Sequence, residues 1–154
     1  MATTYKINDD FYDESFSLIA LHTTLEDFAL AYGLNKTIKA KFVRAKKNFI
    51  LDENKSFPIF DWEDEYNDMY WVLIANHSTE KELIVHDDLF KNETTYKMPR
   101  LIPEYKDVDY LLKIETEKDV DINALIKNIL MLPRVMAAYE ISTDKLKSKN
   151  NLIF

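Results

Sequence analysis

The chain has 154 residues, of which 47% are hydrophobic and 13% aromatic, so it can bury one core but is short for two domains. It has no cysteine, which excludes disulfides and thiolate chemistry, and a single glycine, which argues against glycine-rich phosphate-binding loops. A formal net charge of −7 disfavours nucleic acid as a partner, because phosphate binding depends mainly on positive charge. We therefore predict one domain over residues 1–154.

The N-terminal segment gives no sign of export. Residues 1–14 are acidic with isolated aromatic side chains, and we interpret them as an irregular lead-in. They lack the basic and then apolar pattern of a signal peptide, and no apolar run in the chain has the length of a membrane span. The sequence therefore predicts a cytoplasmic protein with no membrane partner.

The first predicted unit is a strand, a helix and a second strand. Residues 16–22 form an apolar run of strand length. Thr23 with Glu26 matches a capping box, which predicts a helix start, and Gly33 predicts a helix end. Apolar side chains at helical spacing predict the buried face of this helix: Leu25, Phe28, Ala29 and Tyr32. Residues 38–42 alternate apolar residues with lysines, which predicts a strand with one face in solvent.

The middle of the chain predicts a hairpin. Residues 57–63 and 69–76 are apolar runs joined by a turn, as expected for two antiparallel strands. Residues 77–100 are less regular, and within them only residues 83–86 predict a short strand.

The second half predicts another strand, helix and strand. Residues 108–115 alternate, so Val108 and the apolar positions after it are expected to face the core, and Asp107, Asp109 and Lys113 the solvent. Residues 122–129 carry a helical stripe behind a capping aspartate, either Asp119 or Asp121, and Pro133 is expected to end that helix. Residues 135–141 alternate as a closing strand.

This order of elements predicts an α+β fold. Each strand–helix–strand unit implies a parallel strand pair with a right-handed crossover. We therefore expect a ferredoxin-like or ACT-like βαβ–ββ–βαβ sandwich, with two helices on one face of a mixed sheet.

Several separated motifs resemble one bacterial family. Ile102-Pro103-Glu104, followed after three residues by Val108-Asp109-Tyr110, resembles the signature of the IPExxxVDY family. Other similar pieces are Leu25 to Phe28, Leu30 to Tyr32, Phe57 to Phe60, and Leu146 to Phe154. Gly33 departs from the pattern, where a bulkier apolar residue is expected. The resemblance carries over no catalytic residues.

A second likeness concerns Asp109 to Ile141, which resembles half of an ACT-type domain. It implies binding of a small effector at a subunit interface. The corresponding loop, residues 116–118, has no glycine to let a ligand approach the backbone.

The candidate chemistry rests on histidine and carboxylates. His22 lies between a strand end and a helix start, and it could act with Glu26, Glu104 or Asp109 as an acid–base or metal-dependent set. An acidic row at Asp61, Glu63 and Glu65 spreads along one strand at about 6.6 Å per two residues, too far apart for one ion. We therefore predict no metal and no cofactor, and expect this row to pair with Lys39 and Lys41 on a neighbouring strand.

The C-terminal tail, residues 145–154, is polar until it ends in Leu152, Ile153 and Phe154. These apolar residues are expected to dock, either on their own domain or on a neighbouring subunit. The sequence favours a non-enzymatic cytoplasmic interaction or regulatory module, with a second copy or another cytoplasmic protein as partner. The alternatives are a small metal-dependent or hydrolase-type enzyme using His22, and an ACT-like effector sensor.

Overall fold

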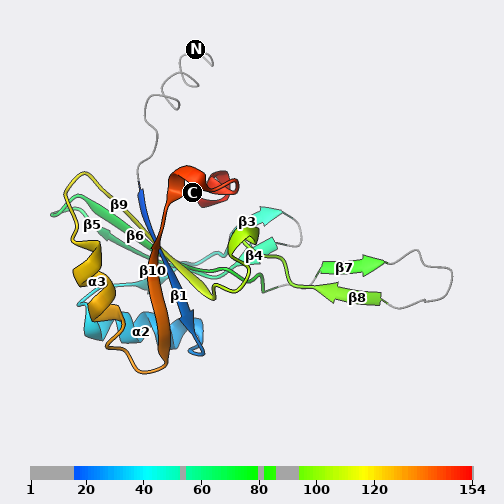
Figure 1. Ribbon diagram of the computed structural model, residues 1–154, viewed down its shortest axis with the longest axis horizontal. Helices are drawn as coiled ribbons and strands as arrows, with labels where there is room; N and C mark the ends of the chain where they lie inside the picture. The colour runs from blue at the N-terminus through cyan, green and yellow to red at the C-terminus, as the bar shows by residue number, and fades with distance from the viewer. Residues whose placement is uncertain (1–15, 53–54, 80–81, 86–93, 154) are drawn as a thin grey trace, which may run out of the picture.

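The computed structural model describes residues 16–52, 55–79, 82–85 and 94–153 (Figure 1). The predicted lead-in at residues 1–14 and the terminal Phe154 lie outside these ranges.

Within the described residues, a six-stranded sheet has the order β10-β1-β9-β6-β5-β2, and every neighbouring pair is antiparallel. Its strands are Phe16–Thr23 (β1), Val43–Arg44 (β2), Ile59–Asp64 (β5), Met69–Ala75 (β6), Tyr110–Thr116 (β9) and Val135–Ile141 (β10). Two hairpins lie outside it: Phe49–Asp52 (β3) with Lys55–Phe57 (β4), and Glu82–Val85 (β7) with Thr94–Lys97 (β8). Figure 1 shows the β7–β8 hairpin extending away from the sheet.

The α+β class is confirmed. Two α-helices, Asp27–Thr37 (α2) and Ile122–Ile129 (α3), pack on the same face of the sheet (Figure 1). The strands joined by each helix do run parallel, but other strands lie between them: β9, β6 and β5 separate β1 from β2, and β1 separates β9 from β10. This split arrangement is consistent with a ferredoxin-like class, and it explains why the sheet is antiparallel throughout instead of mixed.

The two helices differ in how well the sequence predicted them. The side chain of Asp121 accepts a hydrogen bond from the Ala124 amide at 3.1 Å, so the predicted cap of α3 is confirmed. The predicted start of α2 is wrong, because Thr23 stays in β1 and its hydroxyl donates to the Arg134 carbonyl at 2.9 Å. The helix begins at Asp27, and its N-cap Glu26 makes no side-chain capping bond.

The buried face of α2 also differs from the prediction. Phe28 and Tyr32 are 62% and 67% exposed, and the buried residues are Leu30, Ala31 and Leu34. The helix continues through Gly33, where a Cβ atom would lie only 2.5 Å from Cδ2 of Leu132. This glycine therefore allows a close approach to the segment after α3 and does not end the helix.

The predicted strand at residues 38–42 is absent. The side chain of Asn35 accepts a hydrogen bond from the Phe42 amide at 2.8 Å and donates to the Phe42 carbonyl at 3.1 Å. A side-chain amide thus takes the place of a neighbouring strand, and the expected lysine ladder against the acidic row does not form. The sheet is joined here only by the two-residue strand β2.

Both faces of the sheet are covered. The helices cover the first, whose core includes Ile19, Leu73 and Leu112. The second face is covered by residues 101–108 and by the C-terminal tail, with a core that includes Leu18, Leu111 and Leu152. The expectation that Lys113 faces solvent is therefore wrong, since its position on β9 points into this second core and is 0% exposed.

Candidate functional site

The signature segment, residues 101–109, is held by one buried side chain, Asn76, which follows β6. Asn76 is 0% exposed. Its side-chain nitrogen donates to the carbonyls of Tyr105 and Val108, both at 2.9 Å, and its side-chain oxygen accepts from the Ile102 amide at 2.8 Å. Its backbone bonds to Leu101 and Asp109. The signature segment therefore folds around Asn76, which lies outside the signature. The segment itself covers the second face of the sheet.

Glu104, a candidate acid–base residue, lies in the short 3₁₀ helix Pro103–Tyr105 and contacts the tail. Its carboxylate accepts hydrogen bonds from the hydroxyl of Ser148 and from the Ser148 amide, the latter at 3.1 Å. Burial alone would raise the pKa of Glu104, but these bonds from Ser148 bring the pKa below its usual value. Glu104 thus anchors the tail.

We expect Glu104→Gln to lower the free energy of unfolding at neutral pH. Because the folded-state pKa is depressed, the contribution of the carboxylate is present above its usual pKa of 4.5 and is lost as pH falls through the folded value. Urea unfolding of both proteins across this range should show a stability difference that shrinks on acidification. Glu117→Gln, an exposed carboxyl distant in sequence from the tail, is the matched control. A difference that grows toward acid would contradict the assignment.

The tail lies against its own chain. Leu152 is fully buried in the second core, and the side chain of Asn151 donates to the Leu101 carbonyl at 2.9 Å. The buried Lys113 ammonium donates to the Leu152 carbonyl and lies 2.6 Å from the Glu115 carboxylate. Ile153 is half-exposed. The described tail, residues 145–153, therefore lies across the second face of the sheet, and we call it the strap.

His22 does not meet the carboxylates that the sequence placed near it. Its Nε2 lies 2.9 Å from the Tyr139 hydroxyl on the neighbouring strand β10. Of the four candidate residues, Glu26 and Asp109 share one pocket, which His22 does not line.

The histidine that lies in one pocket with Glu26 and Asp109 is His77. It lines a pocket of about 380 Å³ together with Glu26, Asp27, Asp109 and Tyr110. The His77 Nε2 is 3.6 Å from one oxygen of Asp109, whose other oxygen accepts from the Thr23 amide at 2.9 Å. The sequence contained this histidine, but no spacing linked it to the carboxylates, because the pocket combines segments far apart in the chain.

The environment of this pocket shifts two pKa values. Burial and the charge of Arg100 lower the pKa of His77 below its usual 6.5, and they outweigh Asp109, which raises it. Burial raises the pKa of Tyr110 to about 12, and the charges of Asp27, Asp109 and Glu26 act in the same direction. At neutral pH the uncharged forms of His77 and Tyr110 are therefore favoured.

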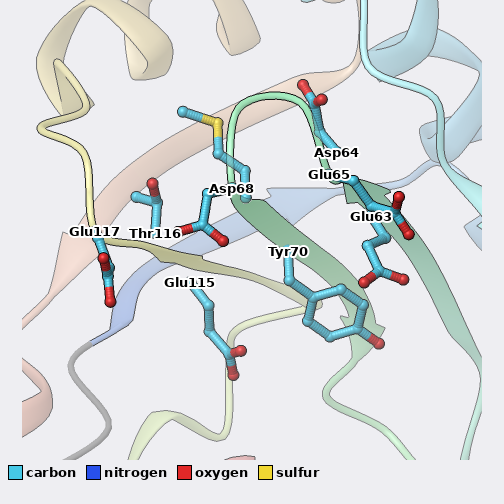
Figure 2. Close-up of a pocket in the computed structure, with 9 residues that line it drawn as sticks. Glu63, Asp64, Glu65, Asp68, Tyr70, Glu115, Thr116 and Glu117 are labelled. Carbon is cyan, nitrogen blue, oxygen red and sulfur yellow. The ribbon is translucent and has the colours of Figure 1, made fainter.

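A second hollow, of about 440 Å³, is strongly acidic, and we call it the acidic cleft. Figure 2 shows its carboxylates, which come from the end of β5, the turn after it and the end of β9. Its acidic residues are Glu63, Asp64, Glu65, Asp68, Glu115 and Glu117. Across the sheet, Glu63 is registered with Tyr70 and Tyr70 with Glu115. Burial raises the pKa of Tyr70 to about 12, with help from its hydrogen bond to Asp61.

The outer edge of β5 adjoins this acidic cleft. Strand β2 pairs only with Phe60 and Asp61. Within the described residues, Trp62–Asp64 therefore has β6 on one side and no strand on the other. A hollow of about 540 Å³ lies along this edge, between it and the segment containing Lys41 and Val43.

Among the described residues, no three histidine, aspartate or glutamate side chains are placed to hold one metal ion. In the same part of the chain, no helix is long and apolar enough to cross a membrane.

Comparison with protein-family models, curated proteins and solved structures gives no match. Membership of the IPExxxVDY family therefore stays a prediction that rests on the residues of the signature.

Proposed function

We propose that this protein is a non-enzymatic, cytoplasmic interaction module that binds a basic, extended segment of another protein along the open edge of β5. The observation that carries the proposal is the shortness of β2, which leaves the backbone of Trp62–Asp64 open beside a hollow lined by carboxylates.

The backbone of an open edge strand can accept another strand. Addition of an extended peptide to a sheet edge uses main-chain hydrogen bonds for affinity and alternate side chains for specificity. In β5, Asp61 and Glu63 lie on one face of the sheet, whereas Trp62 packs toward the helix face. A partner strand would therefore present basic and apolar residues in alternation.

The charge of the edge selects the partner. Glu63, Asp64 and Glu65 line both the edge hollow and the acidic cleft. Two copies of this chain pairing here would place like charges opposite each other, which is destabilising. The other edge strand, β10, has a register shift where it meets His22 and Thr23, and such bulges hinder edge pairing. Both edges thus disfavour pairing with a second copy, and the acidic edge of β5 favours a basic partner.

Binding of short peptides tests this function. A labelled peptide of alternating lysine and valine should bind in fluorescence anisotropy, and an alternating glutamate–valine peptide should not. A lysine–valine peptide that is N-methylated at alternate amides keeps its charge but loses main-chain donors. If the peptide binds as an added strand, the methylated form should bind at least about tenfold more weakly than the unmethylated one. Equal binding of the methylated peptide would overturn strand addition.

Charge reversal locates the site. We expect Glu63→Lys with Glu65→Lys to weaken the lysine–valine peptide by at least about tenfold, because both exposed carboxylates would become like charges to it. The matched control, Glu140→Lys with Asp144→Lys, makes the same change in net charge at exposed carboxylates that line neither the acidic cleft nor the edge hollow. Equal loss in the control would mean that the peptide senses only the net charge.

A further inference from the structure

The pocket around His77 lies at the opposite end of β5 from the open edge. Pro58, which precedes β5, forms part of its wall, whereas the open edge is at the end of that strand. The pocket volume of about 380 Å³ is in the range of small-molecule sites. The walls combine apolar side chains, including Leu25 and Ala75, with a few converging polar groups.

Asp109 is the fixed polar group of this pocket. Its backbone amide donates to the Leu21 carbonyl and its carbonyl accepts from the Asn76 amide, both at 3.0 Å. Its side-chain Oδ2 accepts from the Thr23 amide, which leaves Oδ1 directed toward His77. An aspartate held by β1 and by the residue after β6 is preorganised to receive a donor without rearrangement.

The charge of the lining defines the class of ligand. Among the described residues that line the pocket, Glu26, Asp27 and Asp109 carry carboxylates, and only His77 can carry a positive charge. The Tyr110 hydroxyl already donates to the Leu25 carbonyl at 2.9 Å, so its oxygen is left as an acceptor. The lining thus offers mainly acceptors beside a small apolar wall.

We propose that this pocket binds a small organic cation, whose ammonium or guanidinium group contacts Oδ1 of Asp109 and whose short apolar chain lies against Leu25, Pro58 and Ala75. Glu26, at the N-cap of α2 and without a capping bond, is free to turn toward the ligand. This pocket shares no lining residue with the hollow at the β5 edge, so cation binding and peptide binding can be tested separately.

Protonation of His77 would work against this ligand. A positive imidazolium beside Asp109 neutralises the carboxylate that receives the cation. Arg100, which is bridged to His77 through the backbone, already contributes positive charge on that side. Asp109, just before β9, and Glu26 and Asp27, at the start of α2, line the same pocket with negative charge. Binding should therefore weaken as pH falls below the usual histidine range.

Agmatine, which carries an amine and a guanidinium on a four-carbon chain, is a suitable probe. In NMR titrations of the full chain, agmatine should shift the amides of Thr23 and Thr79 in the pocket, and butyrate and 1-butanol should not. Asp109→Asn keeps an oxygen for the Thr23 amide but removes the charge, and we expect at least about tenfold weaker binding. Glu26→Gln, at an exposed position that the fold tolerates, should weaken binding by about threefold.

Two controls complete the test. Glu140→Gln, distant from the pocket, should leave agmatine affinity unchanged, and His77→Gln should remove the weakening that appears as pH falls below about 6.5. The proposal is overturned if agmatine shifts no pocket amide, if butyrate shifts the same amides equally, or if both Asp109→Asn and Glu26→Gln bind as the wild type does.

Discussion

Replacing Asn76 by alanine is expected to lower the free energy of unfolding by about 3–5 kcal/mol, because three side-chain hydrogen bonds are lost in a fully buried site. The larger part of this cost comes from the groups left behind. The Val108 carbonyl and the Ile102 amide would be left buried without this partner, whereas the Tyr105 carbonyl would keep its bond from the Val108 amide. Chemical denaturation with urea, followed by tryptophan fluorescence, measures the loss.

Two further variants separate hydrogen bonding from packing at this site. Asn76→Asp has almost the same volume but cannot donate to the two carbonyls, so it should cost at least as much as alanine. Asn123→Ala, an exposed asparagine of α3, should change stability by no more than about 0.5 kcal/mol. If Asn76→Asp were as stable as the wild type, the signature segment would not depend on these donated bonds.

The second large effect concerns the buried Lys113. We expect Glu115→Gln to destabilise the protein by about 3 kcal/mol, because it leaves a fully buried ammonium without its neighbouring carboxylate. Lys113→Met should cost about 1 kcal/mol or less, since methionine fills a similar volume and Glu115 is partly exposed to solvent. The comparison is made by thermal and urea unfolding of both variants.

The double variant Lys113→Met with Glu115→Gln tests the coupling. Once the ammonium is gone, the loss of the carboxylate should add little, so the double variant should resemble Lys113→Met alone. Additive costs for the two changes would show that the pair contributes nothing beyond its separate contacts. The 4.8 Å approach of the Lys113 ammonium to the ring of Phe16 predicts that some stabilisation of the lysine remains in Glu115→Gln.

Regular elements with a strong period were predictable from the sequence. The strands β1, β5, β6, β9 and β10 and the helix α3 lie within two residues of their predicted bounds, since their apolar patterns match one structure only. In two of the failures, a side-chain contact outside the periodic pattern decided the outcome. Asn35 replaced a strand partner for Phe42, and the strap turned Lys113 from a solvent-facing position into a buried one.

The candidate site was less predictable. Glu26 and Asp109 could be selected as chemically interesting carboxylates, but their partner His77 is joined to them only by tertiary structure. The open edge of β5 follows from a missing strand, and strand length at residues 38–44 depended on the Asn35 contact. Periodicity reports on residues that are close in sequence, whereas both sites are formed by residues from segments far apart in the sequence.

The position of β1 has a consequence for synthesis on the ribosome. Among the described residues, β1 pairs only with β9 and β10, which are synthesised late. Leu18, for example, lies opposite Lys113 of β9 and Ile141 of β10. While translation proceeds, its apolar residues have no sheet partner until most of the chain has been made, and the second core also awaits Leu152. Contacts of such high sequence separation form slowly. We therefore expect nascent chains to need protection of β1 until β9, β10 and Leu152 have emerged, and products truncated before these residues to be aggregation-prone.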